Sequence, residues 1–367
     1  MSETHFVPRW ASPPGDTIRE IMSTRDVGEA DLLDGLGLRP HDLGDFLEGN
    51  TPMTINLADR LTGLVGGSVE FWMTRDGQYR TDLRRVAADR WASALPVAEM
   101  ARHGWIASPG RDWEDRIEAC LEFFGVEDVY AWEEAQSALL ARARFRSSAS
   151  VESDDNAVAV WLRQTEVELT KIECASFDRA EFGKLLPRLR RLTLESDPSA
   201  FLPLLAAECA AVGVAVGVVK PPTRCAVSGV ARRLENGNPS IALTGRYRSD
   251  DHLWFSFFHE AAHLVLHDED AIFLDEIEPG QPEPSQDSQE AEADRYAGEL
   301  LVPPQFEAAV FDARRDPLEL RKLSKRLGVS IGVLIGHLQH RGALGYGSRL
   351  NKLKRRYRWN GVSLEKA

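Results

Sequence analysis

Residues 257–267 read FFHEAAHLVLH, so three histidines and a glutamate interrupt an otherwise apolar run. Residues four apart share one face of an α-helix, so His259 and His263 can direct two imidazole nitrogens at one ion. Glu260 lies beside them and can hold and deprotonate a water molecule, as in the HExxH helix of zinc peptidases. The alternative interpretation is that these histidines are buried core residues with hydrogen-bond partners of their own.

A catalytic zinc needs a third protein ligand and one open position. His267 lies about 12 Å from His259 along a helix axis, which is too far for both to bind one ion at about 2.1 Å. A following helix offers Glu290, with Asp294 four residues later on the same face, where it can hydrogen-bond a ligand histidine. The residues therefore predict a His, His, Glu zinc site with Glu260 as general base and Asp294 behind a ligand.

Two other acids of that helix, Glu292 and Glu299, suit the third ligand less well because no acid or amide follows four residues later. At such a site Glu260 takes the proton of a zinc-bound water, and the resulting hydroxide attacks a peptide carbonyl. The oxyanion that forms needs a further donor. The candidates for this donor are Tyr247, Tyr296 and His267. The sequence does not choose among them, and His267 also suits a place at the helix end or behind a ligand.

The segments around these helices predict how the site is positioned. Residues 201–219 read as a helix followed by a buried strand, and the runs 213–219, 225–233 and 239–245 predict three strands of a small sheet. Asp250 and Asp251 can cap the helix that continues to His267. Residues 275–289 form a Pro/Gln/acidic loop, which we expect to be mobile and to border the substrate groove. A second helix covers 290–304 and ends at its prolines.

The N-terminal part reads as a string of short helices, and residues 29–50 have the spacing of a helix-turn-helix. The continuation 57–84 resembles the closing helices of the antitoxin-like branch of the Xre repressor family, in which Phe71 and Trp72 would be core residues. DNA contacts by Arg39 and His41 would follow from that fold. However, residues 16–60 hold ten acidic residues against four arginines, a net charge of −6 that repels phosphate. We therefore expect protein docking or a homodimer here.

Two further segments carry no catalytic signal. Residues 85–195 are rich in Ala, Leu, Arg and Glu and predict helices, with a polar loop at 147–157. Residues 320–344 form another helix-turn-helix-like pattern, which is read as a helical tail of the peptidase domain. The segment 349–358 has six basic residues in ten, and we expect an intramolecular or solvated basic face, with nucleic-acid contact as the alternative.

Composition limits the location and the partners of the protein. The 367 residues carry a net charge of −13, which argues against a surface that follows a phosphate backbone throughout. The four cysteines are far apart in sequence, as free thiols in a reducing compartment would be. The chain begins without a basic and apolar leader, and no segment reads as a membrane span. A cytoplasmic protein without membrane contact is expected.

The two metal-site segments, SDDHLWFSFFHEAAHLVLH (249–267) and EAEADRYAGELLVPP (290–304), closely resemble the ImmA/IrrE family of bacterial metallopeptidases. The specific resemblance covers residues 240–305. It implies a zincin core, often behind an Xre-type domain, with zinc ligands, base and supporting acid at the positions deduced above. Ala261–Ala262 stand where the family commonly has a glycine, and Tyr296 stands where it has phenylalanine.

The predicted fold is α+β and mostly helical. Its parts are a helix-turn-helix bundle (1–90), a helical linker domain (91–195), a gluzincin-like peptidase core with a small sheet (196–305) and a helical tail (306–367). The predicted function is zinc-dependent cleavage of a specific regulatory protein, repressor-like or antitoxin-like, in a stress, toxin–antitoxin or phage-related response. The alternative is a transcriptional regulator or antitoxin in which the zinc fold is only a sensor or scaffold.

Overall fold

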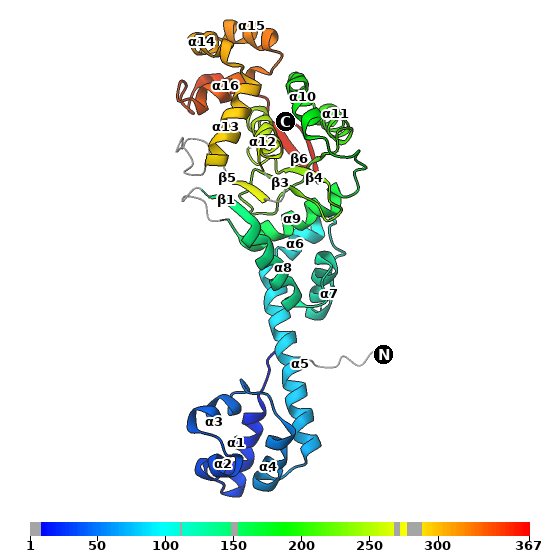
Figure 1. Ribbon diagram of the computed structural model, residues 1–367, viewed down its shortest axis with the longest axis vertical. Helices are drawn as coiled ribbons and strands as arrows, with labels where there is room; N and C mark the ends of the chain where they lie inside the picture. Colours follow the sequence, from blue (N-terminus) through cyan, green and yellow to red (C-terminus); the bar gives the residue numbers. More distant parts are fainter. Residues whose placement is uncertain (1–8, 111, 148–152, 268–271, 277–287) are drawn as a thin grey trace. The chain divides into compact units, whose positions relative to one another are not determined.

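The computed structural model describes residues 9–110, 112–147, 153–267, 272–276 and 288–367, which form two compact units (Figure 1). The first unit comprises Met1–Ala94, Gly110–Leu121 and Val126–Val129, and the second comprises Leu95–Pro109, Glu122–Gly125 and Tyr130–Ala367. The predicted mostly helical α+β fold with a small sheet is confirmed. The predicted boundaries near residues 195 and 305 lie inside the second unit and stay predictions.

The first unit is built on short helices. They are α1 (Pro14–Arg25), α2 (Glu29–Leu36), α3 (Pro40–Leu47), α4 (Ile55–Val65) and the longer α5 (Val69–Ala94). Figure 1 shows α1 to α4 gathered around the first turns of α5. Their apolar faces meet in one core, which includes Ile18, Leu32, Leu43, Leu61 and Trp72. The predicted helical pair at 29–50 is thus present as α2 and α3.

One predicted core residue of this unit is exposed. Trp72 is fully buried and donates its indole N–H to the carbonyl of Gly66 at 2.9 Å, whereas Phe71 is 44% exposed. Consecutive residues of a helix point about 100° apart. The face of α5 that packs on the core is too narrow to bury both Phe71 and Trp72. The prediction was therefore correct for Trp72 and wrong for Phe71.

The second unit contains the sheet and the remaining helices. The elements before the sheet centre are α6 (Val97–Arg102), α7 (Trp113–Phe124, shared with the first unit), α8 (Val129–Arg142), β1 (Ala143–Ser147), α9 (Asp155–Leu169), α10 (Arg179–Leu189), the 3₁₀ helix η1 (Arg190–Leu194) and α11 (Pro198–Ala210). The central elements are β2 (Ala215–Val218), β3 (Gly229–Arg233), β4 (Pro239–Leu243), α12 (Asp250–Leu266), β5 (Ile272–Glu276) and α13 (Ser288–Leu301). The last elements are α14 (Pro304–Asp312), α15 (Pro317–Leu327), α16 (Ile331–His340), η2 (Arg349–Leu353), β6 (Tyr357–Asn360) and β7 (Ser363–Lys366).

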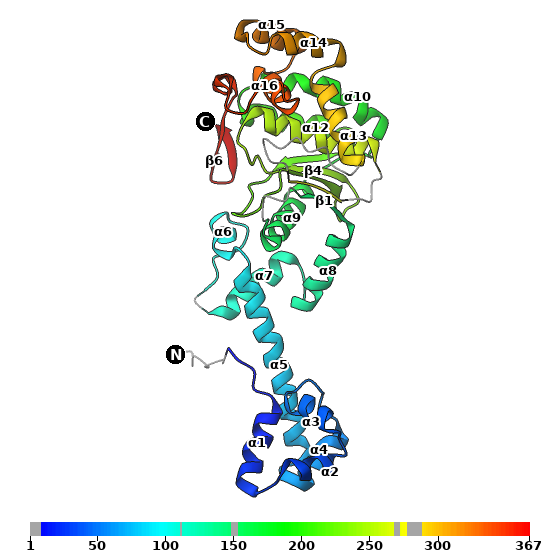
Figure 2. The same ribbon diagram turned by 90° about the vertical axis from the view of Figure 1, so that its left-hand side faces the viewer.

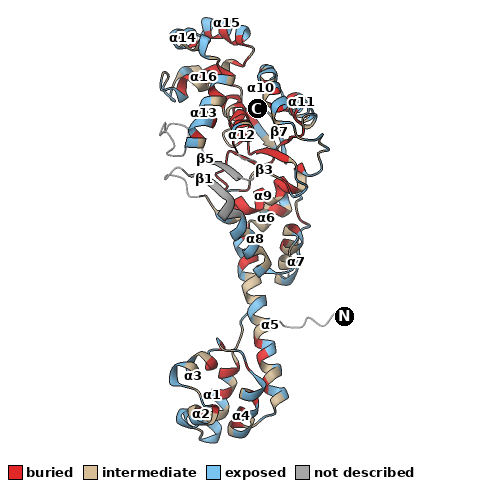
Figure 3. Ribbon diagram, viewed as in Figure 1, coloured by how far each residue is buried: buried red, intermediate tan, exposed pale blue. Residues whose placement is uncertain are grey.

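The central sheet has the strand order β1-β5-β3-β4-β2. β3 is antiparallel to both neighbours, whereas β2 is parallel to β4 and β1 is parallel to β5. Helices cover both faces, with α12 on one side and α9 on the other (Figure 2). Burial follows this layering, since α9, β3 and α12 are largely buried (Figure 3). A separate hairpin is formed by β6 and β7.

The alternation of side chains along the strands explains the two covered faces. Val216, Ala231 and Ile241 pack into the core around α12, whereas their neighbours Val230 and Ala242 pack into the core around α9. Successive residues of a strand point to opposite faces, so apolar residues at consecutive positions demand a layer on each side. This places α12 directly against the middle of the sheet.

Several local predictions can now be judged. The strands predicted at 213–219, 225–233 and 239–245 are present as β2, β3 and β4, and the helix before them is α11. Ser249, rather than an aspartate, occupies the cap position of α12. α9 begins at Asp155, inside the predicted loop 147–157, because Asp154 accepts the Asn156 N–H as a helix cap. β1 and β5 were not predicted.

The structure describes only the two ends of the loop predicted at 275–289. Its first two residues belong to β5 and its last two to α13, and residues 277–287 lie outside the described part of the chain. All four cysteines are free thiols, as predicted. No helix among the described residues is long and apolar enough to cross a membrane.

Candidate metal centre

Helix α12 carries the two histidines into the middle of the second unit. It is buried on most of its sides, and its large apolar residues Trp254, Phe257 and Phe258 are at most 1% exposed. A helix surrounded in this way belongs to the core rather than to the surface. Small residues let α13 approach closely, since Ala261 of α12 and Ala293 of α13 are fully buried. These contacts bring the start of α13 to the second half of α12.

The N-terminal end of α12 is held by buried polar contacts. Asp250 Oδ2 accepts the Ser330 hydroxyl at 2.7 Å, and its Oδ1 accepts the Arg355 backbone N–H at 3.1 Å. Asp251 forms a buried ion pair with Lys354. Burial raises the pKa of Asp250 to about 6. The position of α12 along its axis is therefore determined by residues about a hundred positions later in the chain.

Two residues of the basic segment 349–358 take part in intramolecular contacts. Lys354 is 9% exposed and lies against Asp251. The Arg355 guanidinium donates to the backbone carbonyls of Thr193, Leu194 and Glu195 at 2.6–2.7 Å. For these two residues, the prediction of an intramolecular basic face is confirmed.

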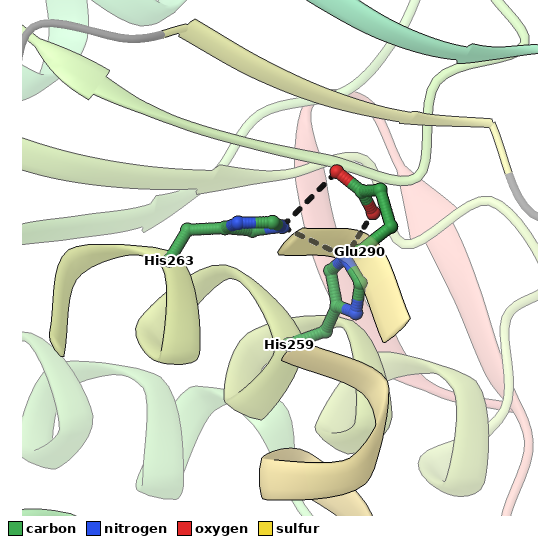
Figure 4. Close-up of side chains that lie close together, drawn as sticks. All are labelled: His259, His263 and Glu290. Carbon is green, nitrogen blue, oxygen red and sulfur yellow. Dashed lines mark hydrogen bonds and ion pairs between the residues drawn. The ribbon is translucent and has the colours of Figure 1, made fainter. Parts of the chain in front are cut away.

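Three side chains converge on one point between α12 and α13 (Figure 4). The Nε2 atoms of His259 and His263 are 3.1 Å apart. Glu290 places Oε2 3.1 Å from His259 Nε2 and Oε1 3.4 Å from His263 Nε2. Ligand atoms about 2.1 Å from a tetrahedral zinc ion stand about 3.4 Å from one another. The buried His-His-Glu group therefore has the spacing of a metal-binding site.

The protonation states of this group suit metal binding. Burial, together with the neighbouring His259 and His267, lowers the pKa of His263 to about 4, although Glu290 acts in the opposite direction. Burial alone would raise the pKa of Glu290, but hydrogen bonds with His259 and His263 lower it well below its usual range. At neutral pH the group thus offers a neutral imidazole and a carboxylate, the forms that bind a metal ion.

Asp294 lies behind His259. Its Oδ1 is 3.0 Å from His259 Nδ1, the ring nitrogen that faces away from Glu290. Asp294 follows Glu290 by one helical turn, so one face of α13 supplies both carboxylates. A carboxylate in this position fixes the ring orientation and the tautomer of a ligand histidine.

His267 lies behind the other histidine. Its Nδ1 is 3.0 Å from His263 Nδ1, and its Nε2 is 3.3 Å from Glu292 Oε2. His267 is therefore on the side of His263 that faces away from the convergent atoms. This geometry excludes His267 from the metal-binding group and argues against its use as an oxyanion donor.

The carboxylate of Glu260 is fully buried next to β3. A β-carbon at Gly229 would stand 2.7 Å from Glu260 Oε1 and 2.9 Å from its Cγ. Contacts that short are impossible, so the strand can approach the glutamate only because residue 229 is glycine. Glu260 thus lies between the sheet and the helix, next in sequence to the histidine that contacts Glu290.

The other predicted site residues make contacts of their own. The Tyr247 ring stacks on His252 at 4.3 Å between centroids, two helical turns before Glu260, and Tyr296 packs against the main core. In the first unit, Arg39 pairs with Asp42 at 2.7 Å and His41 lies 3.5 Å from Asp45. Arg39, the residue before α3, and His41 thus both lie beside acids of α3.

Comparison with known proteins supports this site. Residues 226–338 match the family model of the IrrE N-terminal-like domain, Peptidase_M78. The match begins just before β3 and ends in α16, and it includes His259, His263 and Glu290. No curated protein and no solved structure matched the chain. The matched domain and its buried His-His-Glu group are consistent with a zinc metallopeptidase.

Two residues beside the site were missed from the sequence. Gly229 belongs to a predicted strand, but nothing in the residue pattern connects that strand with Glu260. Glu292 was considered only as a ligand, and it instead contacts His267. The sequence did offer a signal for the contact between His263 and His267, because residues one helical turn apart lie on one face of the helix.

Proposed function

We propose that the protein is a zinc-dependent endopeptidase. The observation that carries this proposal is the buried His259, His263 and Glu290 group, whose ligand atoms stand 3.1–3.4 Å apart, with the buried Glu260 next to His259 in sequence. Peptide hydrolysis at such a site requires imidazole ligands, a carboxylate ligand and a base that is not itself a ligand. Each of these parts is present within the segment that matches the Peptidase_M78 model.

When bound, a zinc ion supplies Lewis-acid activation of a water molecule and of the scissile carbonyl. Glu260 accepts the proton of the attacking water and passes it to the leaving amine. Because its carboxylate is buried between β3 and α12, few solvent dipoles compete there, and its hydrogen bond to the attacking water is stronger. Asp294 holds His259 in the orientation that directs Nε2 at the site.

For the substrate, we propose a specific cytoplasmic regulatory protein, repressor-like or antitoxin-like. This part of the proposal rests on the resemblance to the ImmA/IrrE family. In the competing function, a transcriptional regulator or antitoxin uses the same fold as a sensor or scaffold. The two functions differ in whether the carboxylate of Glu260 has to accept a proton.

For the N-terminal helices, we propose protein docking or homodimer formation rather than DNA binding. The support is electrostatic. Asp42 and Asp45 of α3 lie beside Arg39 and His41, so two negative charges stand where a helix-turn-helix fold would present its basic side chains to phosphate. The excess of acidic residues over arginines in 16–60 acts in the same direction.

The test compares the full chain with the variant Glu260→Gln, which keeps the shape and the metal ligands but cannot accept a proton. Zinc-loaded protein is incubated with the purified repressor-like and antitoxin-like products of adjacent genes, and fragments are identified by mass spectrometry. Cleavage should occur with the wild type and with the control Glu299→Gln, an exposed acid of α13. It should stop with Glu260→Gln or with a chelator. No cleavage by the wild type, or equal cleavage by Glu260→Gln, would refute the peptidase proposal.

A further inference from the structure

The two histidines of the metal-binding group are supported differently. His259 Nδ1 meets the carboxylate of Asp294, whereas His263 Nδ1 meets the imidazole of His267. His267 ends α12 as its C-cap, and its backbone N–H bonds the His263 carbonyl at 3.0 Å. The His267 ring is thus anchored by its own backbone directly behind His263.

The protons along this chain of contacts follow from the chemistry of imidazole. A histidine that offers the lone pair of Nε2 to a metal ion carries its proton on Nδ1. His263 Nδ1–H can donate to His267 Nδ1 only if that nitrogen is unprotonated, so the His267 proton is on Nε2. That N–H points at Glu292 Oε2, 3.3 Å away. Glu292 therefore selects the tautomer of His267 that accepts from His263.

We infer that His267 and Glu292 are a pair of positioning residues that hold His263 in its ligand orientation. Glu292 acts only through His267. The inference rests on the proposed metal site and goes beyond it, because it assigns to these residues a share of the metal affinity. It also distinguishes His267 from a histidine that only fills space at the end of α12, since a space-filling residue needs no acceptor atom.

The experiment measures zinc affinity of the full chain by competition with a chromophoric chelator, without any substrate. His267→Phe keeps an aromatic ring but removes the acceptor, so affinity should fall by about 10- to 100-fold. His267→Asn should stay within a few-fold of wild type, because Asn Oδ1 is as many bonds from the backbone as His Nδ1 and can accept the same proton.

Glu292 supplies the sharper half of the test. Glu292→Ala should weaken zinc binding several-fold in the wild-type background and leave it unchanged in the His267→Asn background, since the introduced asparagine does not depend on that carboxylate. A direct effect of the Glu292 charge on the ion would not pass through residue 267, so it would be equal in both backgrounds, and it would be small because the side chain is 50% exposed. Glu299→Ala, the removal of another exposed acid of α13, should change nothing.

Three results would overturn the inference. The first is wild-type affinity in His267→Phe, the second is equal loss in His267→Phe and His267→Asn, and the third is an equal effect of Glu292→Ala in both backgrounds. Circular dichroism of each metal-free variant shows whether α12 is still folded, and a d–d spectrum with Co²⁺ reports the ligand geometry directly. A chain that binds zinc as described but cleaves no protein would refute the proposed peptidase and leave this inference intact.

Discussion

Adding one methyl group at Gly229 should disable Glu260 without removing the metal. The new β-carbon would stand 2.7 Å from Glu260 Oε1, and an ordinary contact needs about 3.4 Å, so the carboxylate must withdraw by about 0.7 Å. A misplacement of about 1 Å can reduce a catalysed rate about 100-fold. We therefore expect Gly229→Ala to lower kcat by about 10- to 100-fold while the zinc content stays at about one ion per chain.

The assay is cleavage of a protein substrate found as described above, combined with zinc analysis of the same sample. Gly298→Ala in α13 is the matched control, because a β-carbon there would meet no atom within 4 Å. That variant should keep full activity and gain slightly in stability, since alanine favours a helix interior over glycine by about 1 kcal/mol. Full activity in Gly229→Ala would show that the position of the Glu260 carboxylate does not limit the reaction.

Four further outcomes are expected. The double variant His259→Ala/Glu290→Ala should lose the metal, and full zinc occupancy in it would contradict the site. Lys354→Ala removes the lysine that pairs with the buried Asp251, so the free energy of unfolding measured in urea should fall by about 3–5 kcal/mol. Burial first, then the charges of Arg341 and His340, lower the pKa of His337 from 6.5 to about 4. Between these values only the unfolded chain binds the proton. The free energy of unfolding should therefore fall by about 1.4 kcal/mol for each pH unit between 6.5 and 4, compared with His337→Leu. Urea titrations at several pH values measure this slope. The full chain should not retard duplex DNA at physiological salt, and sub-micromolar binding to a specific operator would contradict the proposed role of the N-terminal helices.

The elements around the metal site could be predicted because their signals are local. The i, i+4 spacing of His259 and His263, and of Glu290 and Asp294, follows from helix geometry alone. Likewise, the short apolar runs between Pro, Gly and Asn were sufficient to predict β2, β3 and β4. Phe71 shows the limit of this reasoning, since a hydrophobic residue next to a buried tryptophan can still be on the exposed side of its helix.

Contacts between distant segments could not be predicted in the same way. β5 pairs with β3 and with β1, which is more than a hundred residues earlier in the chain, and no local pattern specifies such a partner. The approach of Gly229 to Glu260 and the ion pair of Asp251 with Lys354 have the same character. Each of these contacts depends on how the sheet and the helices pack on one another. That packing results from the whole fold and not from any local sequence pattern.

The ties between the first turn of α12 and residues 354–355 have a consequence for synthesis on the ribosome. A nascent chain that has exposed α12 but not Lys354 holds Asp250 and Asp251 without the partners that compensate their burial. At about 5–20 residues per second, the intervening hundred residues take about 5–20 s to translate. We expect α12 to dock on the sheet only after that delay. Chains arrested before residue 354 should accordingly stay sensitive to added protease in the second unit, and early resistance would show that α12 docks without these partners.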